Sequence, residues 1–243
     1  MFTNLVPVNK ERHAGKRIKP IEDYKFASQS FIASVMVHEF VRAAAIYPVV
    51  FLDDKERDGF RPMALMGLEA GENLFVDESG KWQAAYIPAI IRRYPFALAS
   101  TDQENQFTVC IDEGSALVAE EEGEPLFTEE GEPAEALENV KRYLTELQQM
   151  DTFTTAYCKY LTERNMFTPL NMRVRQADQI RNITGCYVIN EERLNNLSSE
   201  RFLEMREKQY LPATYAHLGS LVQIERLLKL KEQPVANPIP KGD

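Results

Sequence analysis

The hydrophobic period changes once along this chain, and that change constrains the fold more than any other feature of the sequence. Between residues 47 and 112, short apolar runs of strand length alternate with turn sequences, whereas from Ala134 to about Arg164 the apolar residues recur with helical spacing. Strands that come first and helices that come later are typical of an α+β fold. We therefore predict a mostly antiparallel sheet from the N-terminal half, packed with helices from the C-terminal half.

The predicted strands of the N-terminal half follow one another closely. They are YPVVFL (47–52), RPMALMGL (61–68), NLFVD (73–77), KWQAAYI (81–87), FALAS (96–100) and FTVCID (107–112). The first two form one hairpin and the next two a second hairpin, because Ser79 and Gly80 suit a tight turn. Pro88 is predicted to open a single helical turn that ends before Pro95.

Three parts of the chain are distinguished by their composition. Residues 1–33 are predicted to form an irregular N-terminal arm, and residues 34–232 a single α+β domain. That domain is sheet-rich over 34–133 and helix-rich over 134–232, with short strands expected near 172–174 and 185–189. Residues 233–243 are rich in proline and are predicted to form a flexible tail.

The net charge of −9 is distributed very unevenly. The segment 94–140 holds thirteen acidic residues and no lysine or arginine, so the rest of the chain has 28 basic side chains against 24 acidic ones. This distribution argues against nucleic-acid binding by a broad basic face. No apolar run is long enough for a transmembrane helix, and the basic N-terminus lacks the apolar core of a signal peptide. We therefore expect a cytoplasmic protein without membrane insertion.

Common catalytic and metal-binding patterns are missing from the sequence. There is no GxGxxG, GxxxxGK[ST], GxSxG or HExxH motif, and the three histidines are scattered. Three well-separated cysteines without a CxxC pair indicate a reducing compartment. The echo EEGEP at 121–125 and 129–133 is interpreted as a solvated acidic loop rather than a calcium site. We predict no metal and no cofactor, and no catalytic residue can be assigned.

The segment YIPAIIRRYPF (86–96) raises the main question about function. Two adjacent arginines lie in an aromatic, apolar run, and on a helical turn or a strand they must point in different directions. One of them is expected at the surface and the other near aromatic rings, paired with a carboxylate such as Glu72 or Asp77. The candidate binding residues are Trp82, Tyr86, Arg92, Arg93, Tyr94 and Phe96, with Glu72, Asn73 and Asp77 in support.

Two interpretations of the more buried arginine stay open at this point. It could act as a clamp that ties this segment to the acidic segment 94–140, whose carboxylates need partners. It could instead line an aromatic pocket and recognise a carboxylate or phosphate on a peptide or small ligand. The two are compatible if a ligand's anion replaces an internal carboxylate.

Several segments of the chain resemble the SapC family of bacterial proteins. The matching stretches are YPVVF (47–51), GENLFVDESGKW (71–82), YIPAIIRRYPF (86–96), GCYVINEERLNNLSSERF (185–202) and YAHLGSL (215–221). They occur in the right order over most of the chain. The resemblance implies a link to a bacterial surface layer (S-layer), but it implies no established activity and no catalytic residues.

The leading hypothesis is a cytoplasmic binding or accessory protein that recognises a protein or peptide partner through the 82–96 surface. The alternative is an enzyme that acts on an anionic small molecule or peptide. In that case Arg92 or Arg93 would hold the substrate, and Glu72 or His217 would transfer a proton. A purely structural S-layer component is a third possibility. The oligomeric state is left open.

Overall fold

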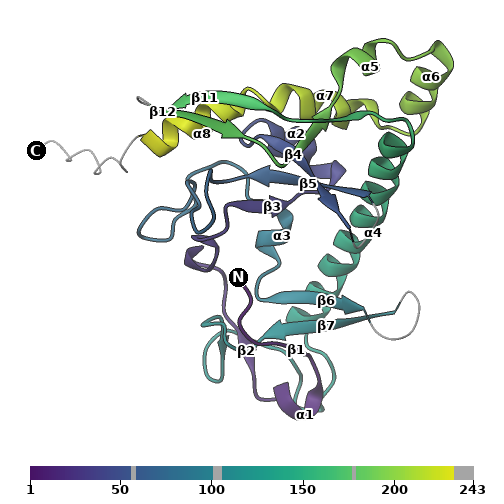
Figure 1. Ribbon diagram of the computed structural model, residues 1–243. Helices are drawn as coiled ribbons and strands as arrows, with labels where there is room; N and C mark the ends of the chain where they lie inside the picture. The colour runs from purple at the N-terminus through teal and green to yellow at the C-terminus, as the bar shows by residue number, and fades with distance from the viewer. Residues whose placement is uncertain (56–58, 101–105, 177–178, 233–243) are drawn as a thin grey trace, which may run out of the picture.

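Two antiparallel sheets lie beside one long helix, α4 (Glu135–Glu163), in a computed structural model of the chain (Figure 1). The structure describes residues 1–55, 59–100, 106–176 and 179–232. The predicted tail, 233–243, and part of the predicted turn 53–59 lie outside these residues. Antiparallel sheets from the N-terminal half and helices from the C-terminal half confirm the predicted α+β class.

The larger sheet has the strand order β10-β13-β4-β5-β3. Its strands are β3 (Ile32–Ser34), β4 (Val49–Asp54), β5 (Gly59–Leu65), β10 (Phe167–Pro169) and β13 (Tyr187–Ile189). The hairpin of β4 and β5 confirms the first predicted pair. β13 comes from the C-terminal half and joins this sheet where Tyr187 lies opposite Phe51. A separate ribbon pairs β11 (Met172–Gln176) with β12 (Gln179–Ile183).

Short helices from both halves of the chain lie near the larger sheet (Figure 1). They are α2 (Phe40–Ala44), which follows the 3₁₀ turn Val37–Glu39, α5 (Glu191–Asn195), α6 (Ser199–Glu207), α7 (Leu211–Ser220) and α8 (Gln223–Glu232). Phe40, Phe51, Tyr157 and Leu161 are fully buried in the core between these layers. Among the described residues, no helix has both the length and the apolar character that a membrane crossing requires.

The smaller sheet, β1-β7-β6, packs against the N-terminal half of α4. β6 (Phe96–Ser100) and β7 (Phe107–Asp112) match the strands predicted at these positions and pair with each other, and β1 (Leu5–Pro7) pairs with the other edge of β7. The short helix α3 (Ala89–Arg92), also predicted, lies between the two sheets (Figure 1). A second core of Phe96, Ile111, Leu126, Leu137 and Leu144 fills this half.

The N-terminal arm is more ordered than its sequence indicates. Besides β1 it contributes α1 (Lys10–His13), the 3₁₀ turn Lys25–Ala27 and β2 (Arg17–Ile18), which lies between β8 (Val118–Ala119) and β9 (Glu124–Pro125). Asp112, fully buried on β7, accepts hydrogen bonds from the backbone N–H groups of Thr3 (3.0 Å) and Asn4 (2.7 Å). Burial tends to raise the pKa of Asp112, but these donors outweigh it and lower the pKa.

The acidic segment finds its partners in the same arm. Lys16 Nζ lies 2.7 Å from a Glu120 carboxylate oxygen, and Arg17 Nε–H donates to the Gly123 carbonyl oxygen at 2.8 Å. Arg12 pairs with Glu113. Glu113 and Glu120 of the acidic segment therefore pair with basic residues of the arm. The clamp interpretation required instead that a carboxylate of this segment pair with Arg92 or Arg93.

The second predicted hairpin, 73–77 with 81–87, is wrong. Within it only an isolated bridge joins Val76 to Trp82. The reason is that side-chain oxygens accept hydrogen bonds from backbone N–H groups that paired strands would use. Asn73 Oδ1 accepts from the Phe75 N–H at 3.0 Å, and Asp77 Oδ1 accepts from the Lys81 N–H at 2.9 Å. The segment is a loop that directs Phe75 and Trp82 into the core.

Candidate functional site

Helix α3 is fixed at its start by side chains from distant parts of the chain. The Ala89 N–H donates to Glu39 Oε1 at 2.8 Å, and the Ala89 carbonyl oxygen accepts from the Tyr143 hydroxyl on α4 at 3.1 Å. Pro88 immediately precedes the helix, where its missing N–H costs nothing. These contacts hold the two arginines of α3 and the turn after it in defined directions.

Glu39 is a buried carboxylate that the sequence analysis did not single out. It is 5% exposed and accepts from the Met36 N–H (2.9 Å), the Ala89 N–H (2.8 Å) and the Tyr86 hydroxyl (2.6 Å). Burial and the negative charge of Glu39 both raise the pKa of Tyr86, so this phenol stays protonated and donates. The available signal was an acidic residue in the apolar stretch VHEFV.

Trp82 and Tyr86 support α3 from the preceding loop. The Trp82 indole N–H donates to the Tyr47 hydroxyl at 3.0 Å, and that hydroxyl donates to the Tyr86 carbonyl oxygen. Trp82 is only 7% exposed, and its ring meets Tyr24 edge-on. Both residues therefore belong to the framework under α3, and Trp82 does not offer a surface for a partner.

The two arginines diverge, and Arg93 is the more buried one. Arg92 is exposed, donates from Nε–H to the Ile87 carbonyl oxygen at 3.1 Å, and lies 5.8 Å from the ring centroids of both Tyr86 and Tyr143. Arg93 is mostly buried, and its guanidinium carbon lies 5.6 Å from the ring centroid of Phe2. The expected separation into one surface arginine and one inward arginine is found.

The carboxylate partner expected for the inward arginine is not found among the described residues. Arg93 makes no ion pair with any of them, and its buried Nε–H has no hydrogen-bond acceptor there. Burial lowers the pKa of Arg93. Glu72 instead accepts from the Leu68 N–H at 2.7 Å and pairs with Lys231, while Asp77 holds its own turn.

The remaining predicted residues are also part of the framework. Tyr94 is 8% exposed, stacks on Phe26 with 4.1 Å between centroids, and donates its hydroxyl hydrogen to Asp112 at 3.3 Å. Phe96 is buried in the core of the smaller sheet. The Asn73 side-chain amide donates to the Ala27 carbonyl oxygen at 3.0 Å. Of the nine predicted residues, Tyr94 lines a cavity of about 530 Å³ beside the N-terminal arm, and Arg93 lines a cavity beside α4.

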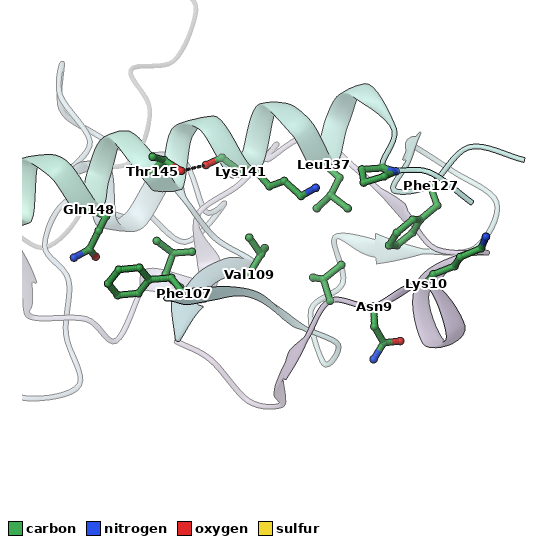
Figure 2. A pocket seen from close by; sticks show the side chains of 12 residues that line it. Asn9, Lys10, Phe107, Val109, Phe127, Leu137, Lys141, Thr145 and Gln148 are labelled. Atoms are coloured by element: carbon green, nitrogen blue, oxygen red, sulfur yellow. Dashed lines mark hydrogen bonds between the residues drawn. The ribbon is translucent and has the colours of Figure 1, made fainter. Parts of the chain in front are cut away.

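Arg93 lines a cavity of about 670 Å³ that is bounded by both sheets, α3 and α4. A second cavity, of about 640 Å³, lies between α4 and the smaller sheet and shares Leu98, Phe107 and Gln148 with the first (Figure 2). A third cavity of about 330 Å³ shares Thr155 with the first. We call the first two cavities together the α4 groove. Its main lining residues are Lys10, Leu98, Phe107, Val109, Leu137, Lys141, Arg93, Gln148, Asp151 and Thr152.

The α4 groove combines an apolar floor with basic side chains. In Figure 2, Leu137 and Lys141 of α4 face Val109 and Phe107 of β7. Among the described lining residues, four are basic (Lys10, Arg61, Lys141 and Arg93) and one, Asp151, is acidic. Each of the two cavities has the volume typical of a ligand site. A basic groove on a chain of net charge −9 favours an occupant with apolar and anionic groups.

The residues that the enzyme hypothesis needed for proton transfer lie outside this groove. His217 on α7 is fully buried, and its Nε2 accepts from the Ile189 N–H at 3.1 Å. Desolvation lowers its pKa to about 4. Neither His217 nor Glu72 lines the cavity of Arg93. The described part of the chain contains no cluster of three or more potential metal ligands.

Comparison with known proteins identifies the family of this chain. No curated protein and no solved structure matches the chain. The model of the SapC family matches residues 8–227, a range that includes the α4 groove and the framework under α3. Nearly the whole described chain is covered, so the chain belongs to the SapC family.

Proposed function

We propose that this protein is a cytoplasmic binding or accessory protein that holds an extended segment of a protein or peptide partner in the α4 groove. The observation that carries the proposal is the line of adjoining cavities along α4, with an apolar floor and basic side chains. From Leu137 to Thr155 the helix rises about 27 Å. An extended segment of about eight residues spans that length.

The shape of the groove favours a polypeptide over a compact small molecule. Successive side chains of an extended segment point to opposite sides, so alternate residues can fill the apolar floor while the others face solvent. Leu98 and Phe107, which line both cavities, provide apolar contact at the centre. Phe107 is 41% exposed, so part of its ring is accessible to a segment in the groove.

The cellular setting is part of the same proposal. The three cysteines, Cys110, Cys158 and Cys186, are buried and form no disulfide, which agrees with a reducing compartment. The SapC resemblance supports a role in the biogenesis of surface-layer or other surface proteins. The bound segment would then belong to a surface protein before its assembly.

Blocking the centre of the groove is expected to abolish peptide binding. Gln148 lines both cavities, so Gln148→Trp should fill the groove, whereas the adjacent Gln149 is exposed and lines neither cavity. A random eight-residue peptide library displayed on phage would be selected on the wild-type protein. The selected peptides should bind Gln148→Trp at least about tenfold more weakly and Gln149→Trp normally, as measured by fluorescence polarisation. Equal binding to both variants would place the peptide site elsewhere.

A further inference from the structure

We propose that the segment bound in the α4 groove carries a carboxylate, and that this carboxylate pairs with Arg93. This inference rests on the proposed function, and it names the chemistry that the groove selects. The basis is the Arg93 guanidinium, which lines the groove and has no counterion among the described residues. Three properties of the first cavity define the anion and its position along the segment.

The first property is the unmet bonding capacity of Arg93. Its Nε–H is buried and has no acceptor among the described residues, and no described carboxylate lies within ion-pair distance. A buried N–H donor without an acceptor is costly, and the Phe2 ring, whose centroid lies 5.6 Å from the guanidinium carbon, compensates only weakly. Arg92, one position earlier, has its Nε–H bonded to the Ile87 carbonyl oxygen. A ligand anion on Arg93 would supply the missing acceptor and a planar bidentate partner.

The second property is the charge balance of the cavity, which favours a single negative charge. Arg61 on the opposite wall is already paired with Asp54, whose Oδ2 lies 2.7 Å from its Nη2. Asp151 on the same wall has an interaction partner of its own, so Arg93 is the charge of the described lining that is left to match. A carboxylate adds one charge and matches Arg93, whereas a phosphate dianion would exceed the positive charge that is left.

The third property is the position of Arg93 relative to the apolar floor. Hydroxyl groups of Ser34 and Thr152 line the cavity of Arg93, while Leu137 and Val109 line the neighbouring one. Between Asp151 and Leu137 the helix rises about 21 Å, the length of about six extended residues. The segment therefore has an acidic residue at one end and apolar residues over the next positions. At the far cavity Lys141 is already paired with Glu138, its Nζ lying 2.7 Å from Oε1, so Lys10 is the residue that can provide a second, weaker anionic contact.

Peptide pools that differ in a single functional group test the inference. The probes are fluorescein-labelled, C-terminally amidated octapeptides with Leu, Val, Ala, Ser or Thr at the variable positions. One pool has a fixed glutamate at its second position and at its seventh, and the other has glutamine at both. We expect the glutamate pool to bind wild-type protein about ten- to a hundredfold more tightly than the glutamine pool.

Arginine variants assign that preference to a residue. In Arg93→Gln the affinity of the glutamate pool relative to the glutamine pool should fall to about one. In the matched control Arg92→Gln this affinity ratio should remain as in wild type. Both variants are checked for folding by thermal denaturation. If Arg93→Gln does not fold, the affinity ratio of the two pools for wild-type protein still tests for a carboxylate. The variant Arg93→Lys then replaces Arg93→Gln. Lysine keeps the charge but loses the planar fork, so it should give an intermediate affinity ratio.

The possible failures are distinguishable. If both pools bind equally and Gln148→Trp blocks both, the groove binds peptides but the carboxylate inference is overturned. If neither pool binds the wild-type protein, the proposed function itself fails together with the inference. A third pool with glutamine and a free C-terminal carboxylate identifies the source of the anion. Tight binding of that pool, lost in Arg93→Gln, supports the inference with a chain terminus as the carboxylate.

Discussion

Replacing Glu39 by alanine is expected to lower the free energy of unfolding by about 3 to 5 kcal/mol. The substitution removes the acceptor of three hydrogen bonds and leaves the N–H groups of Met36 and Ala89 buried without partners. Each such group costs about 1–3 kcal/mol, and only part of this is offset because the buried charge is also removed. Urea denaturation of the wild-type and variant proteins measures the difference.

Two further variants show that the effect comes from the Glu39 contacts. Tyr86→Phe removes one of the three donors and leaves Glu39 bonded to the backbone, so a loss of about 1 kcal/mol is expected. Glu146→Ala, at an exposed position on α4, should change stability by less than about 0.5 kcal/mol. A loss below about 1 kcal/mol for Glu39→Ala would show that the buried network contributes little to stability.

Lowering the pH from 7 to 4 is expected to remove about 3 kcal/mol of stability through His217 alone. In the folded protein burial holds its pKa at about 4, whereas in the unfolded chain an ordinary histidine titrates near about 6.5. Between these values the unfolded chain binds the proton and the folded protein does not. The stabilisation is therefore complete above about pH 6.5 and is lost as the pH falls toward 4.

A comparison with His217→Gln isolates this contribution. Glutamine can still accept a hydrogen bond from the Ile189 N–H but does not titrate, whereas other groups titrate equally in both proteins. The stability advantage of wild type over the variant should shrink by about 3 kcal/mol between pH 7 and pH 4, as measured by urea denaturation at several pH values. Parallel stability curves over this range would contradict the assignment.

Sequence patterns predicted those elements whose contacts are local. Periodicity and turn residues predicted the hairpin of β4 and β5, the positions of strands β6 and β7, helix α3 after Pro88 and the long helix α4. The strand β1 could not be predicted in this way. It has three residues, and its partner β7 lies more than a hundred positions away, so its formation depends on tertiary pairing.

The site was predictable only in part. The sequence indicates that Arg92 and Arg93 diverge, but which of them points inward depends on how α3 is held by Glu39 and Tyr143. The α4 groove has walls from the arm, β7 and α4, and no local pattern brings Lys10, Phe107 and Lys141 together. Trp82 looked like a surface anchor, but its single indole N–H is used by Tyr47 inside the core.

Strand β13 is synthesised well after β4, so β4 lacks this neighbouring strand during part of translation. Phe51 on β4 lies opposite Tyr187 on β13, 136 positions later in the sequence. At about 5–20 residues per second the ribosome needs about 7 to 27 s to add that stretch. During this interval one edge of β4, with the apolar side chains of Val49, Val50 and Phe51, lacks its final neighbour. The unpaired edge of the nascent chain can pair with strands of other chains. We therefore expect the yield of folded protein to depend on chaperones that cover this edge until synthesis is complete.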